Sequence, residues 1–126
     1  MSMTCVLVVD DQVLNLDLVE CVLDAAGVRV RCAVDAVAAR ESLRNERPDL
    51  ILLDIQLPGE DGLSLARELK ADASLARVPL IAFTAHAMSG DEARFRAAGF
   101  DGYLAKPIDV ASFADSLRRY VAQAAP

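Results

Sequence analysis

The sequence has no apolar run of the roughly 18 residues that a membrane-spanning helix requires. Its first residues, MSMTC, lack the basic and long apolar segments of a signal peptide. Lysines and arginines number 13 against 19 aspartates and glutamates, and the net charge of −6 argues against binding along a phosphate backbone. We therefore expect a cytoplasmic protein with no membrane anchor and no direct nucleic-acid ligand.

Cysteine is also scarce, and the absence of a C-x-x-C pair argues against zinc binding and dithiol redox chemistry. The three cysteines are Cys5, Cys21 and Cys32, an odd number that leaves one unpaired in any disulfide scheme. Each lies in an apolar stretch, where cysteine acts as a small hydrophobic residue. We predict that all three are buried packing residues in a reducing compartment.

Hydrophobic residues, in contrast, are plentiful. They make up 54% of the 126 residues, with 25% charged, which excludes an intrinsically disordered chain and allows one substantial core. No linker, low-complexity tract or charge block divides the sequence. It therefore predicts a single domain over residues 1–126, with a core from about residue 4 to 121.

Short apolar runs alternate with amphipathic stretches along the chain. The runs predict strands at residues 5–9, 28–33 (an edge strand), 50–53, 79–83 and 102–105. Helical spacing and capping residues predict helices at residues 13–26, 35–46, 63–71, 89–99 and from 109 onward. The segment 55–62 is expected to be a loop. The alternation predicts an α/β fold, (βα)5 and flavodoxin-like, whose doubly wound parallel five-stranded sheet has the order 2-1-3-4-5.

Polar residues with useful chemistry follow four of the predicted strands: Asp10-Asp11, Asp54, Thr84 and Lys106. Ligands of doubly wound sheets bind beyond the carboxyl ends of the strands where the strand order reverses. Asp10, Asp11 and Asp54 are therefore expected side by side, and a hard cation such as Mg²⁺ would offset their repulsion. With Lys106 as a cation and Thr84 as a hydroxyl donor, Asp54 is the candidate nucleophile for an aspartyl phosphate.

From about residue 4 to 121 the sequence resembles a bacterial two-component response-regulator receiver domain. The motifs that carry the resemblance are VVDD at 8–11, LLDI at 52–55, LPG at 57–59, DG at 61–62, TA at 84–85 and KP at 106–107. Asn15 and the stretch 84–88 are most similar to single-domain cell-cycle, or polar-differentiation, receivers and to hybrid-kinase receivers.

The resemblance implies a phosphorylation switch. Asp54 would accept a phosphoryl group from a sensor histidine kinase, a histidine phosphotransfer protein or acetyl phosphate. Asp11 and Asp54 would bind Mg²⁺, with Mn²⁺ as a substitute. The backbone carbonyl of Gln56 would be a third protein ligand, and Asp10 would act through water.

The resemblance also assigns the groups that respond to phosphorylation. Thr84 and Lys106 would each bond a phosphoryl oxygen, and Pro107 would follow a cis peptide bond. Tyr103 would swing inward when Thr84 is drawn to the phosphate, although a packed strand aromatic is the alternative for this residue. Partners would read the surface of the fourth helix, fifth strand and fifth helix.

Five residues are assigned to phosphoryl lifetime and to partner contact. Gln56 and His86 each follow a site residue by two positions and match positions that tune phosphoryl lifetime in receivers. His86 is the only histidine, and a lone histidine is poor evidence for a metal ligand or catalyst. Leu14, Asn15 and Leu18 are assigned to partner contact, with core packing as the alternative for the two leucines.

The function expected first is a stand-alone switch that is not an enzyme toward any external substrate. It would catalyse only its own phosphorylation and dephosphorylation and signal to an unknown downstream protein by protein–protein contact. Met1 and the lack of a linker after Val121 favour a complete single-domain protein. The alternative is a receiver segment of a longer hybrid kinase or regulator, for which residues 122–126 would be a truncated end.

Two other classes fit the sequence poorly. An aspartyl-phosphate phosphatase usually places its nucleophile on the first strand, two residues before a second aspartate. Here the first strand is followed by Asp10-Asp11-Gln12, which lacks that spacing. A flavin-binding domain would need serine, threonine and glycine at the same place, where the two carboxylates would repel its phosphate.

Overall fold

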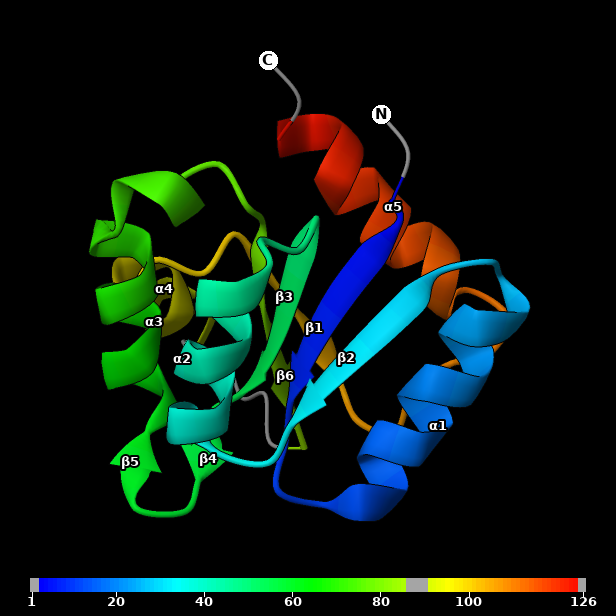
Figure 1. The fold of residues 1–126 in the computed structure, drawn as a ribbon, viewed down its shortest axis with the longest axis horizontal. Coiled ribbons are helices and arrows are strands. Elements are labelled where there is room, and N and C mark those ends of the chain that lie inside the picture. Colours follow the sequence, from blue (N-terminus) through cyan, green and yellow to red (C-terminus); the bar gives the residue numbers. More distant parts are fainter. Residues whose placement is uncertain (1–2, 86–90, 125–126) are drawn as a thin grey trace.

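The computed structural model describes residues 3–85 and 91–124 as a parallel sheet with helices on both faces (Figure 1). The strands of this sheet are β1 (Cys5–Val9), β2 (Arg29–Ala33), β3 (Leu50–Asp54), β6 (Leu80–Thr84) and β7 (Gly102–Ala105). Their order is β2-β1-β3-β6-β7, with every neighbouring pair parallel. The predicted doubly wound fold is confirmed, including the edge position of the second strand.

The helices form two layers. They are α1 (Val13–Ala25), α2 (Ala36–Asn45), α3 (Gly62–Ala71), α4 (Asp91–Ala97) and α5 (Phe113–Ala124), with a short 3-10 helix η1 (Ala73–Leu75). Figure 1 shows α1 and α5 on one face of the sheet and α2 and α3 on the other, where α4 also packs. In the described part of the chain, none of these helices has the length and apolarity that crossing a membrane requires.

The central strands explain why both faces are covered. In β1, Leu7 and Val9 belong to the core cluster under α2 and α3, whereas Val6 and Val8 belong to the cluster under α1 and α5. Successive side chains of a strand point to opposite faces. A strand that is apolar at every position therefore needs a helix layer on each side, as the continuous runs of β1 and β3 predict.

Local signals in the sequence set several helix ends where they were expected. Asp35 caps α2, because its side chain accepts a hydrogen bond from the Ala38 backbone N–H at 2.8 Å. Gly27 follows α1 with φ of +81°, the left-handed conformation that glycine adopts at helix C-termini.

The segment predicted as a loop between β3 and α3 is instead a small hairpin. Its strands are β4 (Gln56–Leu57) and β5 (Glu60–Asp61), which pair antiparallel. Pro58 and Gly59 occupy the turn, and the φ of +76° at Gly59 is the value that a type II turn requires at its second central position. The strands are too short for the alternating pattern by which a strand is recognised.

The start of the last helix and the burial at the start of α1 differ from the expected pattern, although α1 begins at Val13 as predicted. The last helix was expected from Asp109, but α5 begins at Phe113. Asp109 caps only a preceding turn through the Ala111 N–H, so Val110 lies before the helix and is 60% exposed. At the start of α1, Val13 is 61% exposed, so the buried ridge is Leu16, Val19 and Leu23.

The prediction that all three cysteines are buried was wrong for two of them. Cys5 is buried in β1, whereas Cys21 and Cys32 are exposed. Cys21 follows buried Val19 by two positions and so lies on the outer side of α1. Cys32 is an exposed residue of the edge strand β2, near Glu20. Partial burial of its sulfur, together with that carboxylate, raises the pKa of the thiol to about 11.

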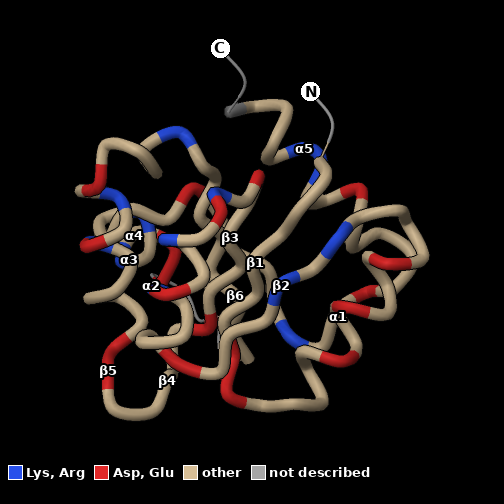
Figure 2. The backbone as a smooth tube through the Cα atoms, in the orientation of Figure 1, with Lys and Arg blue, Asp and Glu red and all other residues tan. Residues whose placement is uncertain are grey.

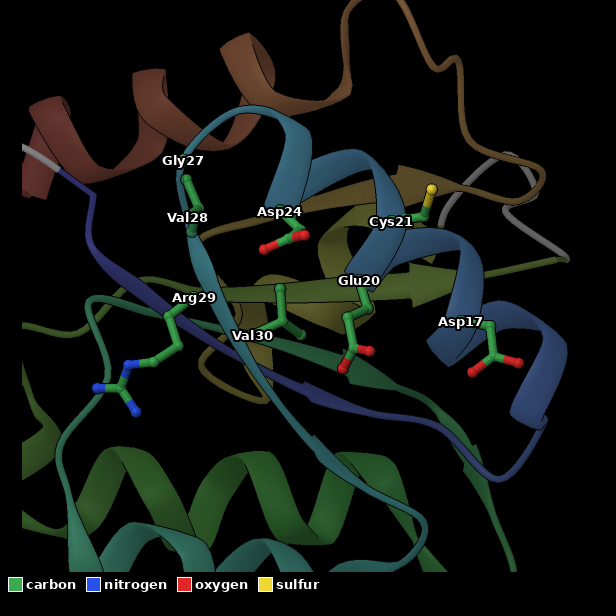
Figure 3. Close-up of a pocket in the computed structure, with 8 residues that line it drawn as sticks. All are labelled: Asp17, Glu20, Cys21, Asp24, Gly27, Val28, Arg29 and Val30. Carbon is green, nitrogen blue, oxygen red and sulfur yellow. The ribbon is translucent and has the colours of Figure 1, made fainter.

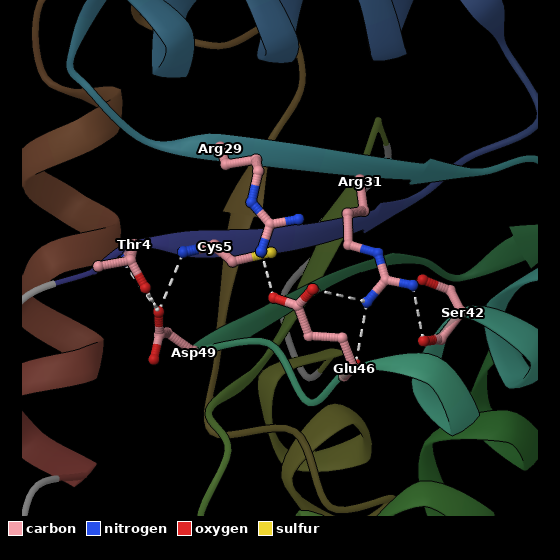
Figure 4. A network of polar contacts seen from close by, with 7 residues as sticks. All are labelled: Thr4, Cys5, Arg29, Arg31, Ser42, Glu46 and Asp49. Carbon is pink, nitrogen blue, oxygen red and sulfur yellow. Dashed lines mark hydrogen bonds and ion pairs between the residues drawn. The ribbon is translucent and has the colours of Figure 1, made fainter.

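The β2 edge carries opposite charges on neighbouring elements. Figure 2 shows basic residues along β2 and acidic residues along α1. Arg29 forms an ion pair with Glu46, and Arg31 bonds the carbonyls of Glu46 and Ser42 at 3.1 and 2.8 Å (Figure 4). Charged side chains on an edge strand oppose pairing with a strand of another chain.

Candidate functional site

Three carboxylates meet at the carboxyl ends of the two central strands. Asp54 ends β3, and Asp10 and Asp11 follow β1, whose Val9 is in register with Leu53. Asp10, Asp11 and Asp54 each offer an oxygen within 4.8 Å of the other two. The predicted convergence is therefore confirmed. Asp10 is wholly buried and Asp54 is 6% exposed, while Asp11 faces solvent.

Lys106 supplies the positive charge of the cluster. Its Nζ lies 2.8 Å from Oδ2 of Asp10 and 3.1 Å from Oδ2 of Asp54. The aromatic ring of Phe83 lies below the ammonium, at 5.0 Å from the ring centroid. The Lys106–Pro107 peptide bond is cis, as the resemblance implies, and the Lys106 backbone N–H donates to the Thr84 carbonyl at 2.8 Å.

The charges at this site do not balance. The formal charges of three carboxylates and one ammonium sum to −2. Two carboxylate charges at the upper limit of 4.8 Å repel by about 3–4 kcal/mol at an effective dielectric near 20, and closer charges repel more. Burial, opposed by hydrogen bonds from the Gln56 N–H and Lys106, raises the pKa of Asp54 above its ordinary value. Burial lowers the pKa of Lys106, but its bonds to Asp10 and Asp54 outweigh this and raise it.

Backbone and side-chain donors fix the two buried carboxylates. The Gln56 N–H donates to Oδ1 of Asp54 at 3.0 Å, and the Gln12 N–H donates to Oδ1 of Asp10 at 2.9 Å. The Asn15 amide donates to Oδ2 of Asp10 at 3.2 Å. Both buried carboxylates are therefore held in one orientation before any ligand arrives.

Sequence reasoning missed part of this support. The sequence assigns neither Gln12 nor Phe83 to the site, yet Gln12 donates to Asp10 and the Phe83 ring lies against Lys106. Asn15 was assigned to partner contact, yet the structure brings it to Asp10, with a second bond to the Gln12 side chain at 2.8 Å. A polar residue one helical turn beyond the first-strand aspartates was the available signal for Asn15.

The remaining predicted site residues lie around this centre or beyond the described chain. Thr84 is buried at the end of β6. It follows Phe83, which is in register with Asp54 of β3. Tyr103 on β7 is 37% exposed and its ring meets that of Phe95 edge-on at 6.0 Å. His86 lies outside the described residues.

Leu14 and Leu18 of α1 are 83% and 40% exposed. This excludes the core-packing alternative that the sequence left open for both leucines. Together with Val13, which is 61% exposed, they form an exposed apolar strip on α1.

A cleft of about 390 Å³ gives access to the carboxylates. Its lining residues are Asp11, Gln12, Asp54, Gln56, Leu57, Pro58, Ala85 and Lys106. A larger hollow, of about 730 Å³, lies between α1 and the edge strand β2 (Figure 3). The carboxylates of α1 line that hollow, but Arg29 turns away from them to pair with Glu46. Only the smaller cleft in this pair contains the convergent groups.

The donor set suits a hard divalent cation. Oxygen ligands from carboxylates are those that Mg²⁺ prefers, usually one or two together with water and phosphate oxygens. The local charge of −2 equals the charge that such an ion would neutralise. The residues present therefore fit a magnesium ion at the mouth of this cleft.

Comparison with known proteins identifies the family. A family model described as the response regulator receiver domain matches residues 6–118. The chain belongs to this family. The chain is 40% identical over 119 residues to the polar-differentiation response regulator DivK of Brucella anthropi, covering 94% of this chain and 97% of that protein. DivK of Brucella ovis is also 40% identical, over 122 residues.

Solved structures give the same result for the fold. The receiver domain of the sensor histidine kinase PA1611 from Pseudomonas aeruginosa superimposes with a TM-score of 0.85 at 37% identity, covering 96% of this chain and 99% of that one. That structure has a magnesium ion coordinated in its active-site cleft. The chemotaxis protein CheY4 of Vibrio cholerae superimposes with a TM-score of 0.88 at 25% identity, covering 94% of this chain and 99% of that one.

Proposed function

We propose that this receiver domain is a stand-alone phosphorylation switch in which Asp54 accepts a phosphoryl group from a histidine kinase, a histidine phosphotransfer protein or acetyl phosphate. The observation that carries the proposal is the convergence of Asp10, Asp11 and Asp54 within 4.8 Å, with the Lys106 ammonium on Asp54. A nucleophilic carboxylate between a cation and a metal site is the arrangement that phosphoryl transfer requires.

Asp11 and Asp54 would hold Mg²⁺, or Mn²⁺ in its place, with the carbonyl of Gln56 as a third ligand and Asp10 acting through water. When bound, the ion supplies positive charge to the phosphoryl oxygens during transfer. Asp10 also serves the site without metal, because it accepts from Lys106 and from the Gln12 N–H and so holds the lysine beside Asp54.

The proposed transfer is an in-line displacement. An oxygen of Asp54 forms a bond to phosphorus while the bond from phosphorus to the donor nitrogen of phosphohistidine, or to the oxygen of acetyl phosphate, breaks. The electron pair leaves with the imidazole or acetate. Lys106 and Thr84 would then each contact a phosphoryl oxygen. Because Lys106 already contacts Asp54 at 3.1 Å, its charge is present before the reaction.

The later steps of the switch involve residues around the site. Thr84 would move toward the phosphoryl group and Tyr103 would turn inward from its half-exposed position. The surface of α4, β7 and α5 would then change for a downstream protein. Gln56 and His86 would set the lifetime of the phosphoryl group by their effect on hydrolytic water. We assign Leu14, Asn15 and Leu18 to contact with the phosphoryl donor.

The domain would act on no external substrate, and it would bind neither nucleic acid nor membrane. We propose that it works in the cytoplasm as one domain over residues 1–126, with its core at about 4–121. The similarity to DivK over 97% of that protein's length supports a single-domain regulator.

The direct test is labelling with radioactive acetyl phosphate in the presence of Mg²⁺. Wild type should acquire an acid-stable, base-labile label, and Asp54→Asn should acquire none. Asp24→Asn, which removes one exposed carboxylate of α1, is the matched control and should label like wild type. Persistent labelling of Asp54→Asn at another residue would refute the assignment of the acceptor.

A second setting for the same chemistry is a receiver within a hybrid kinase. It is favoured by the 37% identity to the receiver domain of sensor kinase PA1611. An immunoblot of native cells separates the two: a band near 13.5 kDa supports the stand-alone switch, and a much larger band supports the hybrid kinase.

A further inference from the structure

We propose that Arg40 is a positioning residue for the magnesium site. From helix α2 it holds the β4–β5 hairpin against α3, and so it fixes the backbone at Gln56. This inference rests on the proposed function, because it concerns how the same site keeps its geometry. Arg40 itself does not line the cleft and would touch neither metal nor phosphoryl group.

Arg40 connects three elements that are far apart in the sequence. Its Nη2 bonds a carboxylate oxygen of Glu60 in β5. The same guanidinium bonds Glu68 of α3 twice, with Nε 2.7 Å from Oε2 and Nη2 2.8 Å from Oε1. A planar guanidinium with two parallel bonds to one carboxylate has a defined orientation, which lysine cannot reproduce. Glu68 therefore fixes the direction from which Arg40 holds Glu60.

The hairpin that Arg40 holds leads directly from the acceptor aspartate. Gln56 follows Asp54 by two residues, donates to its Oδ1 at 3.0 Å, and lines the cleft together with Leu57 and Pro58. Glu60 is paired with Leu57 across the hairpin. A displacement of Glu60 would therefore move its cross-strand partner Leu57, which is the neighbour of Gln56 in the sequence.

Both strands of the hairpin have an anchor, and the two anchors differ. On β4, Leu57 packs against the core cluster below α2 and α3. On β5, Glu60 is held by an ion pair with Arg40. The side chain of Arg40 is 29% exposed and that of Glu60 is 32% exposed. A partly buried pair loses less to solvent and salt than a fully exposed one. The apolar contact sets the depth of the hairpin, and the ion pair sets its distance from α2.

The chain offers a matched pair of variants to test this. Glu60→Gln and Glu68→Gln each remove one negative charge that contacts Arg40, so both change the net charge by the same amount. Glu60→Gln weakens the contact to the hairpin, whereas Glu68→Gln leaves that contact in place. Arg40→Met removes both contacts.

The first measurement is amide hydrogen exchange over residues 56–62 without Mg²⁺, which does not depend on phosphorylation. We expect the exchange rates in Glu60→Gln and Arg40→Met to rise by roughly 3- to 5-fold, the change expected when one partly exposed ion pair no longer stabilises the hairpin. Exchange in Glu68→Gln should rise by less than half as much. Equal exchange in the two glutamine variants, or unchanged exchange in all three, would overturn the proposal.

The second measurement is Mg²⁺ affinity, from a chemical-shift titration of the protein. The dissociation constant should rise by roughly 3- to 10-fold in Glu60→Gln and Arg40→Met, less than the 10- to 100-fold typical of direct partners of metal ligands. The maximal labelling rate at saturating Mg²⁺ should stay within about 2-fold of wild type, which a general loss of folding would not allow. Looser hairpin exchange with unchanged Mg²⁺ affinity would overturn the positioning role.

Failure of the proposed function would look different. Wild type would then remain unlabelled by acetyl phosphate, while the exchange and Mg²⁺ titrations still compare the three variants.

Discussion

The Nζ of Lys106 lies 3.1 Å from Oδ2 of Asp54, and the same ammonium lies 2.8 Å from Asp10. The lysine thus balances one of the negative charges of the cluster and leaves the rest for a metal ion. Its side chain is 11% exposed, so its charge acts through a partly desolvated environment in which it is worth more than in water. Under the proposed function, the lysine that contacts Asp54 in the free domain would also contact a phosphoryl oxygen after transfer.

The first prediction concerns Lys106→Met. Removing a preorganised donor that stabilises developing charge costs about 10²- to 10³-fold in rate. We expect the labelling rate from acetyl phosphate at saturating Mg²⁺ to fall by at least about 10²-fold, with the far-ultraviolet circular dichroism retained.

Lys70, the only other lysine, is the control for Lys106. It pairs with Asp101 at 2.9 Å and bonds the Val78 carbonyl, away from the cleft. Lys70→Met should lower the free energy of unfolding but leave the labelling rate within about 2-fold of wild type. Equal rates for the two methionine variants would contradict the role of Lys106.

The second prediction concerns Gly62→Ala at the start of α3. A Cβ on Gly62 would lie 2.6 Å from the Asp54 carbonyl oxygen and from the Cα and oxygen of Ile55, all of them backbone atoms. Because backbone cannot rotate away, the end of β3 must shift. We expect a loss of about 1–3 kcal/mol in unfolding free energy, measured with urea, and slower labelling of Asp54.

Gly27→Ala separates these two effects. A Cβ there meets no atom within 4 Å, but φ is +81°, so alanine is strained by about 1–2 kcal/mol. The two variants should therefore lose similar stability, yet only Gly62→Ala should label more slowly. A labelling rate equal to wild type in Gly62→Ala would show that the Asp54 backbone tolerates the shift.

The third prediction is a pH dependence of stability at Asp49. Its carboxylate accepts from the Thr4 N–H at 2.8 Å, the Thr4 hydroxyl at 2.7 Å and the Cys5 N–H at 3.0 Å (Figure 4). Burial raises the pKa of Asp49, but these hydrogen bonds outweigh it and hold the pKa below its ordinary value of 3.8. The carboxylate therefore stabilises the fold fully above about pH 4, and this contribution is lost as the pH falls further.

Asp49→Asn should accordingly be less stable than wild type by about 1–3 kcal/mol at pH 7. The difference should shrink below about pH 4, because wild type then loses the same interaction. Urea unfolding at pH 7, 5 and 3 measures it, with Asp24→Asn as the control for loss of one charge. A difference that is constant from pH 7 to pH 3 would exclude the ionised carboxylate as its source.

The fold and the centre of the site were predictable because both depend on short-range patterns. The all-apolar runs of β1 and β3 require two helix layers, and parallel strands bring their carboxyl ends to one edge of the sheet. Asp10, Asp11 and Asp54 therefore converge in any sheet of this order. Lys106 reaches them from the other side of β3, because β7 runs parallel to β6.

Features that depend on contacts distant in the sequence were not predictable. The bond from Arg40 to Glu60 spans 20 residues, and nothing in either segment indicates the partner. The apolar neighbours of Cys21 and Cys32 could not reveal that Cys21 faces solvent on α1 and Cys32 on the edge strand β2, since hydrophobicity alone does not state which face is covered. Val110 was placed in a helix because its spacing was right, although the helix starts after it.

The last prediction separates partner contact from chemistry at the exposed strip of α1. Leu14 is 83% exposed, so Leu14→Asp should change the free energy of unfolding by no more than about 0.5 kcal/mol. We expect labelling by acetyl phosphate to remain within about 2-fold of wild type, because that donor is too small to use the surface. Phosphotransfer from a phosphorylated histidine kinase or phosphotransfer protein should fall by roughly 10-fold, as expected when a central apolar contact of an interface is lost.

Val37→Asp is the matched control for Leu14→Asp. Val37 is 66% exposed on α2, on the opposite face of the sheet from α1. The substitution therefore adds the same negative charge to a different surface. In Val37→Asp, the rate of labelling by acetyl phosphate and the rate of phosphotransfer from the protein donor should both stay within about 2-fold of wild type. If the two aspartate variants slow phosphotransfer equally, the added negative charge rather than the α1 contact is responsible, and the docking assignment of Leu14 fails. If only Leu14→Asp does so, the protein donor approaches over α1 while the chemistry at Asp54 stays intact.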